Sequence, residues 1–349
     1  MKFFALDCHI GIRDIQHQFE QLGHQLDVHS ISGHAHLMNW NVDNSFIVNK
    51  DNWKSLNQRN FHLFHEYHAD RLKDYDGFVC FYPPAFSMLY EKFDKPIILH
   101  VPIRFEIPFH VNNEELQFYI SHLQRTIDSG QLIPLANNRF DSEFCSDVVG
   151  REFKLIPSLC DYTGKTRSRK SDDVVIHGDL NNKIPSMTGL KKLKSGYSWD
   201  ELYSHKAIVH MPYHNTVMSL FEQYTAGMPL LFPSDDFLLN LWESDKDQTL
   251  SQVSWTKIHG IRSSSIHKMN KLPDINDYNS KESIEFIIKK SDWNDEEWMP
   301  FIRKYENWDH LQHLIQSSNF DDLHELMLDF NLQKKEKVLN MWNNVLSRV

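Results

Sequence analysis

One carboxylate, Glu222, lies inside an otherwise largely apolar segment whose flanks have the composition of strands. Residues 207–211 form an apolar run broken only by His210, and residues 230–232 form a second run. Both runs suit strands of a parallel sheet that is covered on two faces. A helix between them would begin at the carboxyl end of the first strand, where backbone N–H groups and the helix dipole favour a phosphate group.

This predicted helix starts near Asn215 or Thr216, either of which can cap it, and Gly227 can close it in the left-handed conformation. Thr216 and Glu222 are about 9 Å apart along the helix axis at roughly 1.5 Å per residue. A carboxylate at this position could hold ribose hydroxyls while a diphosphate lies at the helix start. The alternative is a buried connecting helix in which Glu222 pairs with a structural Arg or Lys.

Three short stretches carry a family resemblance: Met211-Pro212, Ser219-Leu220-Phe221-Glu222 and Ala226-Gly227-Met228-Pro229. Together they resemble the nucleotide-sugar motif of GT-B glycosyltransferases, in the group whose donor domain carries a Glu and then Ala-x-Gly-x-Pro. The resemblance implies that Glu222 binds the donor ribose, and that Ser219 and the backbone amides of 215–217 meet the diphosphate. Many retaining members carry a second glutamate eight residues before the first. This chain has His214 there, so retention and inversion both stay open.

Glycosyl transfer requires positive charge around the leaving diphosphate, and without a metal ion this charge must come from side-chain cations and helix amides. Lys183 follows a predicted strand end, where ligand sites of α/β sheets lie. Lys165 and Arg167 come just before the same series of elements. Each of them can instead be an ordinary solvated side chain. His214 precedes the predicted helix by one turn and could bond the sugar or its leaving oxygen.

A second group of polar residues follows strands in the N-terminal half. The first predicted strand runs into Asp7 and His9, and the next ends near His34. In a doubly wound arrangement these positions face the ligand cleft. Asp7 or His9 could deprotonate an acceptor hydroxyl, since a neutral imidazole is the natural base near neutral pH. The alternative is that Asp7 caps the following turn and His9 hydrogen-bonds to the backbone.

Arg104 and Glu106 follow another apolar strand and share one side of an extended chain, because they are two residues apart. They could bind the acceptor as a pair, or form a surface ion pair. His62, His65 and His68 could share one helix face and so suggest a metal site. No carboxylate at a catalytic spacing accompanies them, and the resemblance implies chemistry without a metal. We therefore expect no metal site there, nor at His34-Ala-His36.

The 349 residues exceed the usual size of one domain, and the net charge of −10 argues against a dedicated nucleic-acid binder. The four cysteines are scattered, which indicates neither a disulfide framework nor a zinc site. The N-terminus has no signal-peptide layout, and no apolar run approaches the roughly 20 residues that span a bilayer. We therefore expect a cytoplasmic protein without a transmembrane segment.

Strand and helix signals alternate along the first half, and a shorter α/β series follows Ser158. This alternation is typical of mostly parallel sheets. We predict two Rossmann-like domains facing a cleft, as the GT-B resemblance implies: an acceptor-side domain over 1–158, and a reduced donor-binding domain over 159–349.

The tail predicts three helices, around 308–316, 321–328 and 334–346. The resemblance implies that the last of these segments, 334–349, packs back on the N-terminal domain through Trp342 and Leu346. Packing within the second domain is the alternative.

These features predict a glycosyltransferase, hexosyl- or related, that moves a sugar from a nucleotide sugar to a glycan or small-molecule acceptor. We expect it to need no metal and no cofactor beyond its nucleotide-sugar substrate. Two alternatives stay open: a nucleotide-sugar epimerase or hydrolase on the same fold, and a GT-B-like binding protein without catalysis.

Overall fold

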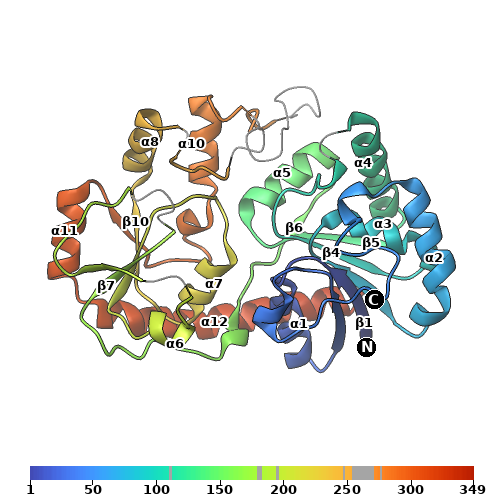
Figure 1. Cartoon of the computed structure of the whole chain (residues 1–349), viewed down its shortest axis with the longest axis horizontal. Helices are drawn as coiled ribbons and strands as arrows, with labels where there is room; N and C mark the ends of the chain where they lie inside the picture. Colours follow the sequence, from blue (N-terminus) through green and yellow to red (C-terminus); the bar gives the residue numbers. More distant parts are fainter. Residues whose placement is uncertain (110–111, 179–182, 194–195, 247, 254–270, 276) are drawn as a thin grey trace. The chain divides into compact units, whose positions relative to one another are not determined.

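The structure is a computed structural model of the chain, and it describes every residue except 110–111, 179–182, 194–195, 247, 254–270 and 276. The chain divides into two compact units. Figure 1 colours the chain by sequence, from blue at the N-terminus to red at the C-terminus. Unit 1 comprises Met1–Ser158, Ile261–Leu272 and Val338–Val349, and unit 2 comprises Leu159–Gly260 and Pro273–Lys337. Each unit holds one parallel sheet with helices, which confirms the predicted Rossmann-like class.

Unit 1 is built on a six-stranded sheet whose described pairings are all parallel. Across the sheet the strands run in the order β2 (Gln25–Ser30), β1 (Lys2–Asp7), β3 (Gly77–Cys80), β4 (Ile97–Val101), β5 (Leu132–Ala136) and β6 (Lys154–Leu155). Every residue of β3 and β4 is buried. Such continuous apolar strands are expected where helices cover both faces of a sheet.

The helices of unit 1 connect these strands. They are α1 (Ile12–Gln21), α2 (Gln58–Leu72), α3 (Ser87–Tyr90), α4 (Asn113–Asp128) and α5 (Arg139–Val149), with 3-10 turns η1 (Ala35–Met38), η2 (Trp53–Ser55), η3 (Pro84–Phe86) and η4 (Glu91–Phe93). Asparagine side chains accept the first N–H groups of three helices: Asn57 at α2, Asn112 at α4 and Asn138 at α5. Asparagine is among the best residues at this position, so these starts are locally encoded.

Unit 2 is built on a five-stranded sheet, again with parallel pairings. Its strands run in the order β11 (Arg303–Tyr305), β10 (Leu230–Pro233), β9 (Ala207–His210), β7 (Val174–His177) and β8 (Leu190–Lys192). Its shorter helices and turns are η6 (Asp161–Thr163), α6 (Trp199–Leu202), α7 (Met218–Thr225), α8 (Asp235–Ser244), α10 (Lys281–Lys289), η7 (Asp292–Asn294) and α11 (Trp308–Ser317). The sheet has one strand fewer than that of unit 1, and each of its five described strands has only three or four residues.

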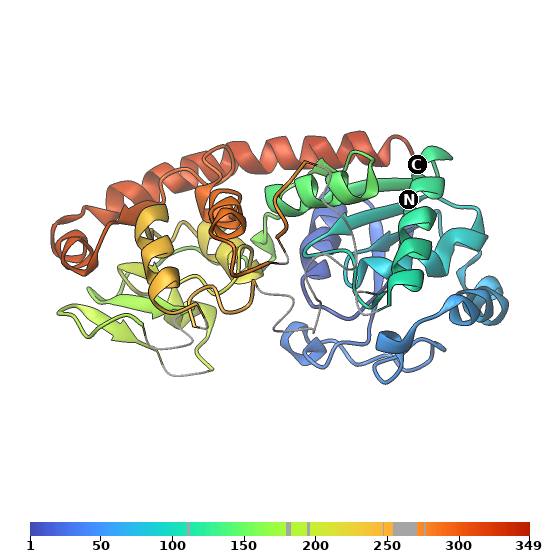
Figure 2. The same cartoon turned by 90° about the horizontal axis from the view of Figure 1, so that it is seen from above.

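The chain ends in one long helix, α12 (Phe320–Leu346), which Figure 2 shows without a break. The prediction of two separate helices here was wrong, because neither glycine nor proline interrupts the helix-forming residues between Leu328 and Lys334. The last turns of α12 belong to unit 1. There the buried ring of Trp342 lies 5.4 Å from Phe19 and 5.2 Å from His100.

Among the helices that the structure describes, none is both long enough and apolar enough to cross a membrane.

Candidate functional site

The sheet of unit 2 changes its winding direction between β7 and β9. From β7 the chain continues to β8 on one side, and from β9 it continues to β10 on the other. In open α/β sheets, ligands bind outside the carboxyl ends of the strands at such a switch point. The residues at these two ends are His177 and His210, which are register partners.

Helix α7 starts later than the sequence predicted. Its N-cap is Val217, and the prediction that Asn215 or Thr216 caps the helix was wrong. Both residues are buried in the preceding loop, where the Thr216 N–H lies 3.2 Å from His214 Nδ1 and the Asn215 carbonyl accepts a backbone N–H. The positive end of the helix dipole therefore lies at 217–219.

The end of α7 follows the prediction. Gly227 has a φ of +69°, as a left-handed helix end requires. A Cβ atom at this position would also lie 2.7 Å from the ring of His324, so the site excludes larger residues for two reasons. Gly227 thus directs the chain from α7 into β10, and this fixes the helix between two neighbouring strands.

Glu222 is partly exposed on α7, between the buried Phe221 and Gln223. The Tyr162 hydroxyl donates a hydrogen bond to Glu222 Oε1, and Trp199 Nε1 donates one to Oε2 at 3.2 Å. Neither of these partners is the Arg or Lys of the structural alternative. Each carboxylate oxygen therefore bonds to a side-chain donor at the edge of an aromatic ring.

Further aromatic residues surround this carboxylate. Burial and then the charge of Glu222 raise the pKa of Tyr197. The same two causes, in that order, raise the pKa of Tyr203, which is buried. Glu222 thus accepts hydrogen bonds from a phenol and an indole. A hydroxyl group of a ligand could take the place of either donor.

Ser219 precedes Glu222 by three residues on α7, so both side chains share one face of the helix. Ser219 is partly exposed. His214 is buried in the loop before the helix, and its Nδ1 lies 3.0 Å from the Thr216 carbonyl oxygen as well as 3.2 Å from the Thr216 nitrogen. This ring nitrogen therefore stabilises the loop before the helix.

The predicted diphosphate cations are all paired with carboxylates within unit 2. Lys183 binds Asp245 at the end of α8, and Lys165 binds Asp200 at 2.8 Å. The buried Arg167 donates to Asp321 on α12 at 2.7 Å and to the carbonyl of His205 at 3.3 Å. Compensation of a diphosphate by these residues would require the exchange of an existing ion pair.

The sequence interpretation missed the histidines at the switch point itself. The rings of His177 and His210 are 5.0 Å apart, and His210 Nε2 lies 2.7 Å from Gln223 Oε1 on α7. Burial lowers the pKa of His177 to about 4, and His177 Nδ1 has no hydrogen-bond partner among the described residues. A histidine that ends a predicted strand immediately before Gly178 was the available signal.

Unit 1 has an equivalent switch point between β1 and β3, since β1 also pairs with β2 on its other side. Asp7 ends β1 and is fully buried. Its carboxylate accepts backbone N–H groups from His9 at 2.6 Å and Tyr82 at 2.7 Å. Burial raises the pKa of Asp7 well above its usual value, while these two hydrogen bonds lower it. This geometry matches the alternative in which Asp7 caps the following turn. A second hydrogen bond comes from Tyr82, in the segment after β3.

His9 Nδ1 accepts the backbone N–H of Gly11 at 3.0 Å. A neutral imidazole with Nδ1 as acceptor carries its proton on Nε2, so Nε2 is a donor. The surrounding protein, and secondly His34, lower the pKa of His9 below its usual value, although the residue itself is solvent-exposed. The geometry therefore favours a neutral hydrogen-bond donor over the predicted general base. His34 is exposed beside it, at the end of the loop after β2.

Arg104 and Glu106 form the predicted pair, but in the core of unit 1. Arg104 Nε donates to Glu106 Oε1 at 3.0 Å, and both residues are no more than 2% exposed. The guanidinium also lies 4.4 Å from the ring centre of Phe144. The surface-pair alternative is therefore wrong, and acceptor binding by this pair would require it to be uncovered.

The three histidines of α2 each make a separate contact. His62 binds Glu66 at 2.7 Å, His65 packs on Phe93, and His68 Nε2 accepts a backbone N–H from Ile47 at 3.2 Å. In the part of the chain that the structure describes, no group of three metal-binding side chains comes together.

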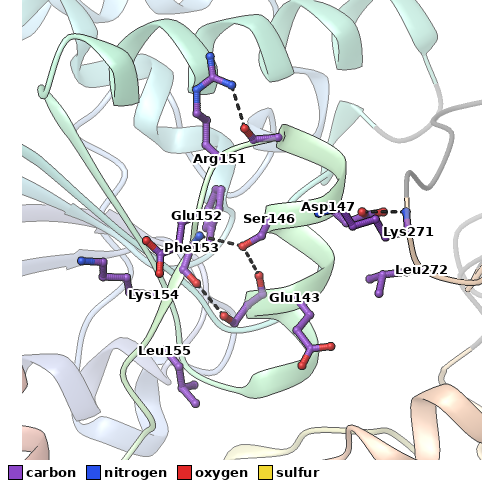
Figure 3. A pocket seen from close by; sticks show the side chains of 12 residues that line it. Glu143, Ser146, Asp147, Arg151, Glu152, Phe153, Lys154, Leu155, Lys271 and Leu272 are labelled. Carbon is purple, nitrogen blue, oxygen red and sulfur yellow. Dashed lines mark hydrogen bonds between the residues drawn. The ribbon is translucent and has the colours of Figure 1, made fainter.

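A cavity of about 730 Å³ lies beside α5 and β6 in unit 1 (Figure 3). Its polar side chains are engaged locally: Asp147 accepts the Lys271 N–H at 3.0 Å, and Arg151 binds Asp128 at 2.7 Å. None of the predicted site residues is among those that line it. Each unit thus has its own group of candidate residues: those around Glu222 in unit 2, and the Asp7 and His9 turn in unit 1.

No protein-family model matches the chain, and no curated protein matches it. Solved structures with a similar chain course include the glycotransferase of kitacinnamycin, at 9% identity and a TM-score of 0.43, with 100% of this chain and 98% of that chain covered. Another is the glycosyltransferase SnogD from Streptomyces nogalater, at 8% identity and a TM-score of 0.44, with 98% of each chain covered. Since both likenesses are this distant, function must be inferred from the chain's own residues.

Proposed function

We propose that this protein is a metal-independent glycosyltransferase that takes a sugar from a nucleotide sugar and passes it to a glycan or small-molecule acceptor. Unit 2 binds the donor at the carboxyl ends of β7 and β9. The nucleotide sugar is a substrate, and the reaction uses no further cofactor.

Glu222 is the observation that supports this proposal most strongly. It lies on the helix that follows β9 at the switch point, it is partly exposed, and both its oxygens already accept donors. The two hydroxyls of a ribose would present the same kind of donor to the same two oxygens. Ser219, one turn earlier, would then lie toward the diphosphate at the positive end of α7.

In this proposal, most of the compensation for the leaving diphosphate comes from the start of α7, because Lys183 and Arg167 already have carboxylate partners. Backbone amides at a helix start stabilise developing negative charge without a metal ion. His214, in the loop before the helix, lies toward the sugar or its leaving oxygen in this proposal. Asn215 and Thr216 shape the loop rather than cap the helix.

The acceptor side is proposed for unit 1. His9 Nε2 donates a hydrogen bond to the acceptor, the exposed His34 lies beside it, and Asp7 holds the turn that carries His9. Arg104 and Glu106 could contact an acceptor only if the buried pair became uncovered. Whether the sugar is transferred with retention or inversion stays open.

One observation favours a second candidate, a nucleotide-sugar-binding protein without catalysis. Both predicted bases are engaged with the backbone, Asp7 through Tyr82 and His9 through Gly11. Product analysis with a broad acceptor panel separates the two functions. A glycosylated acceptor supports the transferase, and bound nucleotide with no product supports the binding protein.

Thermal unfolding with a panel of nucleoside diphosphates and nucleotide sugars tests the donor site, with and without a chelator. A ligand at 100 times its Kd stabilises the protein by about 2.7 kcal/mol. We expect selective stabilisation by one nucleotide, unchanged by the chelator and reduced in Glu222→Gln. Equal stabilisation of the wild type and Glu222→Gln would refute the ribose role, and a requirement for divalent metal would refute the metal-independent mechanism.

A further inference from the structure

The two donors on Glu222 come from separate elements of unit 2. Tyr162 lies in the turn η6, and Trp199 is the first residue of α6. Their ring centres are 6.2 Å apart with an interplanar angle of 65°. Each ring donates to a different oxygen of Glu222, the phenol to Oε1 and the indole to Oε2. One carboxylate is thus shared by two independent side-chain donors.

This arrangement has the hydrogen-bond pattern that a vicinal diol would make. An ionised carboxylate is an acceptor only, and a diol bound across its two oxygens supplies one donor to each. A nucleotide ribose that binds Glu222 must therefore replace the Tyr162 and Trp199 hydrogen bonds. The net gain is the difference between two similar sets of hydrogen bonds, and it is smaller than for a carboxylate with vacant acceptor sites.

We propose that Tyr162 and Trp199 are specificity-determining residues that occupy the ribose-hydroxyl positions of Glu222 when no nucleotide is bound. This inference rests on the proposed function. A ribonucleotide replaces both donors, whereas a 2′-deoxyribonucleotide supplies one hydroxyl and lets one aromatic donor keep its bond. The Tyr162 and Trp199 donors therefore make the affinities for the ribonucleotide and the 2′-deoxyribonucleotide more alike than a carboxylate without these donors would.

The turn η6 lies between two residues with left-handed backbone conformations and borders a cavity. Cys160 and Gly164, on either side of the turn, both have left-handed backbone conformations, with φ of 53° and 61°. A cavity of about 380 Å³ borders the turn at Asp161 and Thr163. The cavity also borders Lys335 of α12, which forms a 2.7 Å ion pair with Asp161. In this proposal the Tyr162 side chain rotates away from Glu222, and Asp161 keeps its ion pair with Lys335 of α12.

Tyr162→Phe is the test variant, because it removes the donor and keeps the ring. Calorimetry with UDP, GDP and ADP and with their 2′-deoxy counterparts gives Kd for each pair. We expect Tyr162→Phe to tighten the selected ribonucleoside diphosphate about threefold to tenfold, the range of one net hydrogen bond. The 2′-deoxy ligand should tighten less in the variant that lacks the donor at the position of the missing 2′-hydroxyl, so the ratio of the two Kd values widens in that variant. Trp199→Phe should act in the same direction.

Tyr75→Phe is the matched control. The Tyr75 hydroxyl also donates to a carboxylate, Asp27 in unit 1, at 2.9 Å. Its loss removes a bond of the same type in the other unit, among residues with no proposed role, so nucleotide affinity should stay unchanged. Circular dichroism and the unfolding temperature of each free variant establish that all of them are folded.

The outcomes separate this inference from the proposed function. If Glu222→Gln weakens binding but Tyr162→Phe leaves it equal or weaker, the inference is wrong and the ribose role stands. If Glu222→Gln has no effect, the ribose role and the inference both fail. If the wild type binds none of the six nucleotides, the Tyr162→Phe, Trp199→Phe double variant decides. Binding by the double variant supports strong competition between the aromatic donors and the ribose hydroxyls. No binding by the double variant overturns both the inference and the ribose role.

Discussion

Asp7 and Glu222 are carboxylates at the switch points of two parallel sheets, yet their surroundings differ. Asp7 is fully buried, and both its oxygens accept backbone N–H groups, one from its own turn and one from the segment after β3. Glu222 is partly exposed and bonds to two aromatic side chains. Backbone donors cannot leave without unfolding the turn, whereas side-chain donors can rotate away. Equivalent topology therefore supports a structural carboxylate in unit 1 and a candidate ligand-binding one in unit 2.

The largest effect should come from Asp7→Ala. The change removes the acceptor of the part-buried N–H groups of His9 and Tyr82, and an unsatisfied group costs up to about 1–3 kcal/mol. We expect a loss of about 2–4 kcal/mol in the free energy of unfolding, measured with urea, and Asp70→Ala, at a fully exposed position, should change it little. If the Asp7→Ala protein is stable but no longer transfers sugar, Asp7 acts as the catalytic base. The contrast between a structural Asp7 and a ligand-binding Glu222 would then be wrong.

Glu222→Ala should show the opposite pattern. Its partners lie at a partly exposed position, where water can replace the lost acceptor, so unfolding should change by less than about 1 kcal/mol. Nucleotide affinity should fall by about 1–3 kcal/mol if Glu222 accepts ribose hydroxyls. Calorimetry and urea unfolding on one preparation measure both quantities. Glu201→Ala on the exposed side of α6 is the control. A large loss of stability with unchanged nucleotide affinity would mean that Glu222, like Asp7, has a structural role and does not bind the ribose.

The histidines at the switch point of unit 2 predict a pH dependence. The folded-state pKa of His177 is about 4, below the usual value near 6.5, so the unfolded chain takes up the proton first as pH falls. Stability should therefore decrease from about pH 6.5 toward pH 4, by up to about 1.4 kcal/mol per pH unit from this group. His177→Gln should flatten the urea-unfolding profile over that window. A profile as steep as that of the wild type would show that His177 is not the titrating group.

The smallest effect is expected for Lys183→Ala. Since Lys183 already binds Asp245, its removal should leave nucleotide affinity within about twofold of the wild type, and loss of a partly exposed ion pair costs at most about 1 kcal/mol of stability. The same titration used for Glu222→Ala measures this change. A tenfold weaker affinity would mean that Lys183 exchanges Asp245 for the diphosphate, and the cation set of unit 2 would then belong to the site.

Several local features could be predicted from the sequence because each depends on neighbouring residues. The apolar runs at 207–211 and 230–232 became β9 and β10, and Gly227 closes the helix between them. The start of that helix could not be located as well. Asn215 and Thr216 are good capping residues, but burial of the loop and the contact with His214 prevent them from capping α7.

The partners of the polar residues were beyond such local patterns. Tyr162 and Trp199 reach Glu222 across 60 and 23 residues, and neither was a candidate. His177 meets His210 because β7 and β9 pair in parallel register. Arg104 and Glu106 were correctly seen as neighbours, but their burial depends on α5, which supplies the Phe144 ring.

The sequence by itself determined that this chain alternates strands and helices into parallel sheets, and that one carboxylate lies on a helix after a buried strand. Hydrophobic periodicity, helix ends and glycine positions are properties of short segments, and they survive without knowledge of the rest of the chain. Only the tertiary structure decided that backbone amides bind Asp7, whereas side-chain donors that a ligand could replace bind Glu222. That difference depends on burial and on donors from distant segments, and these exist only after the sheets have formed.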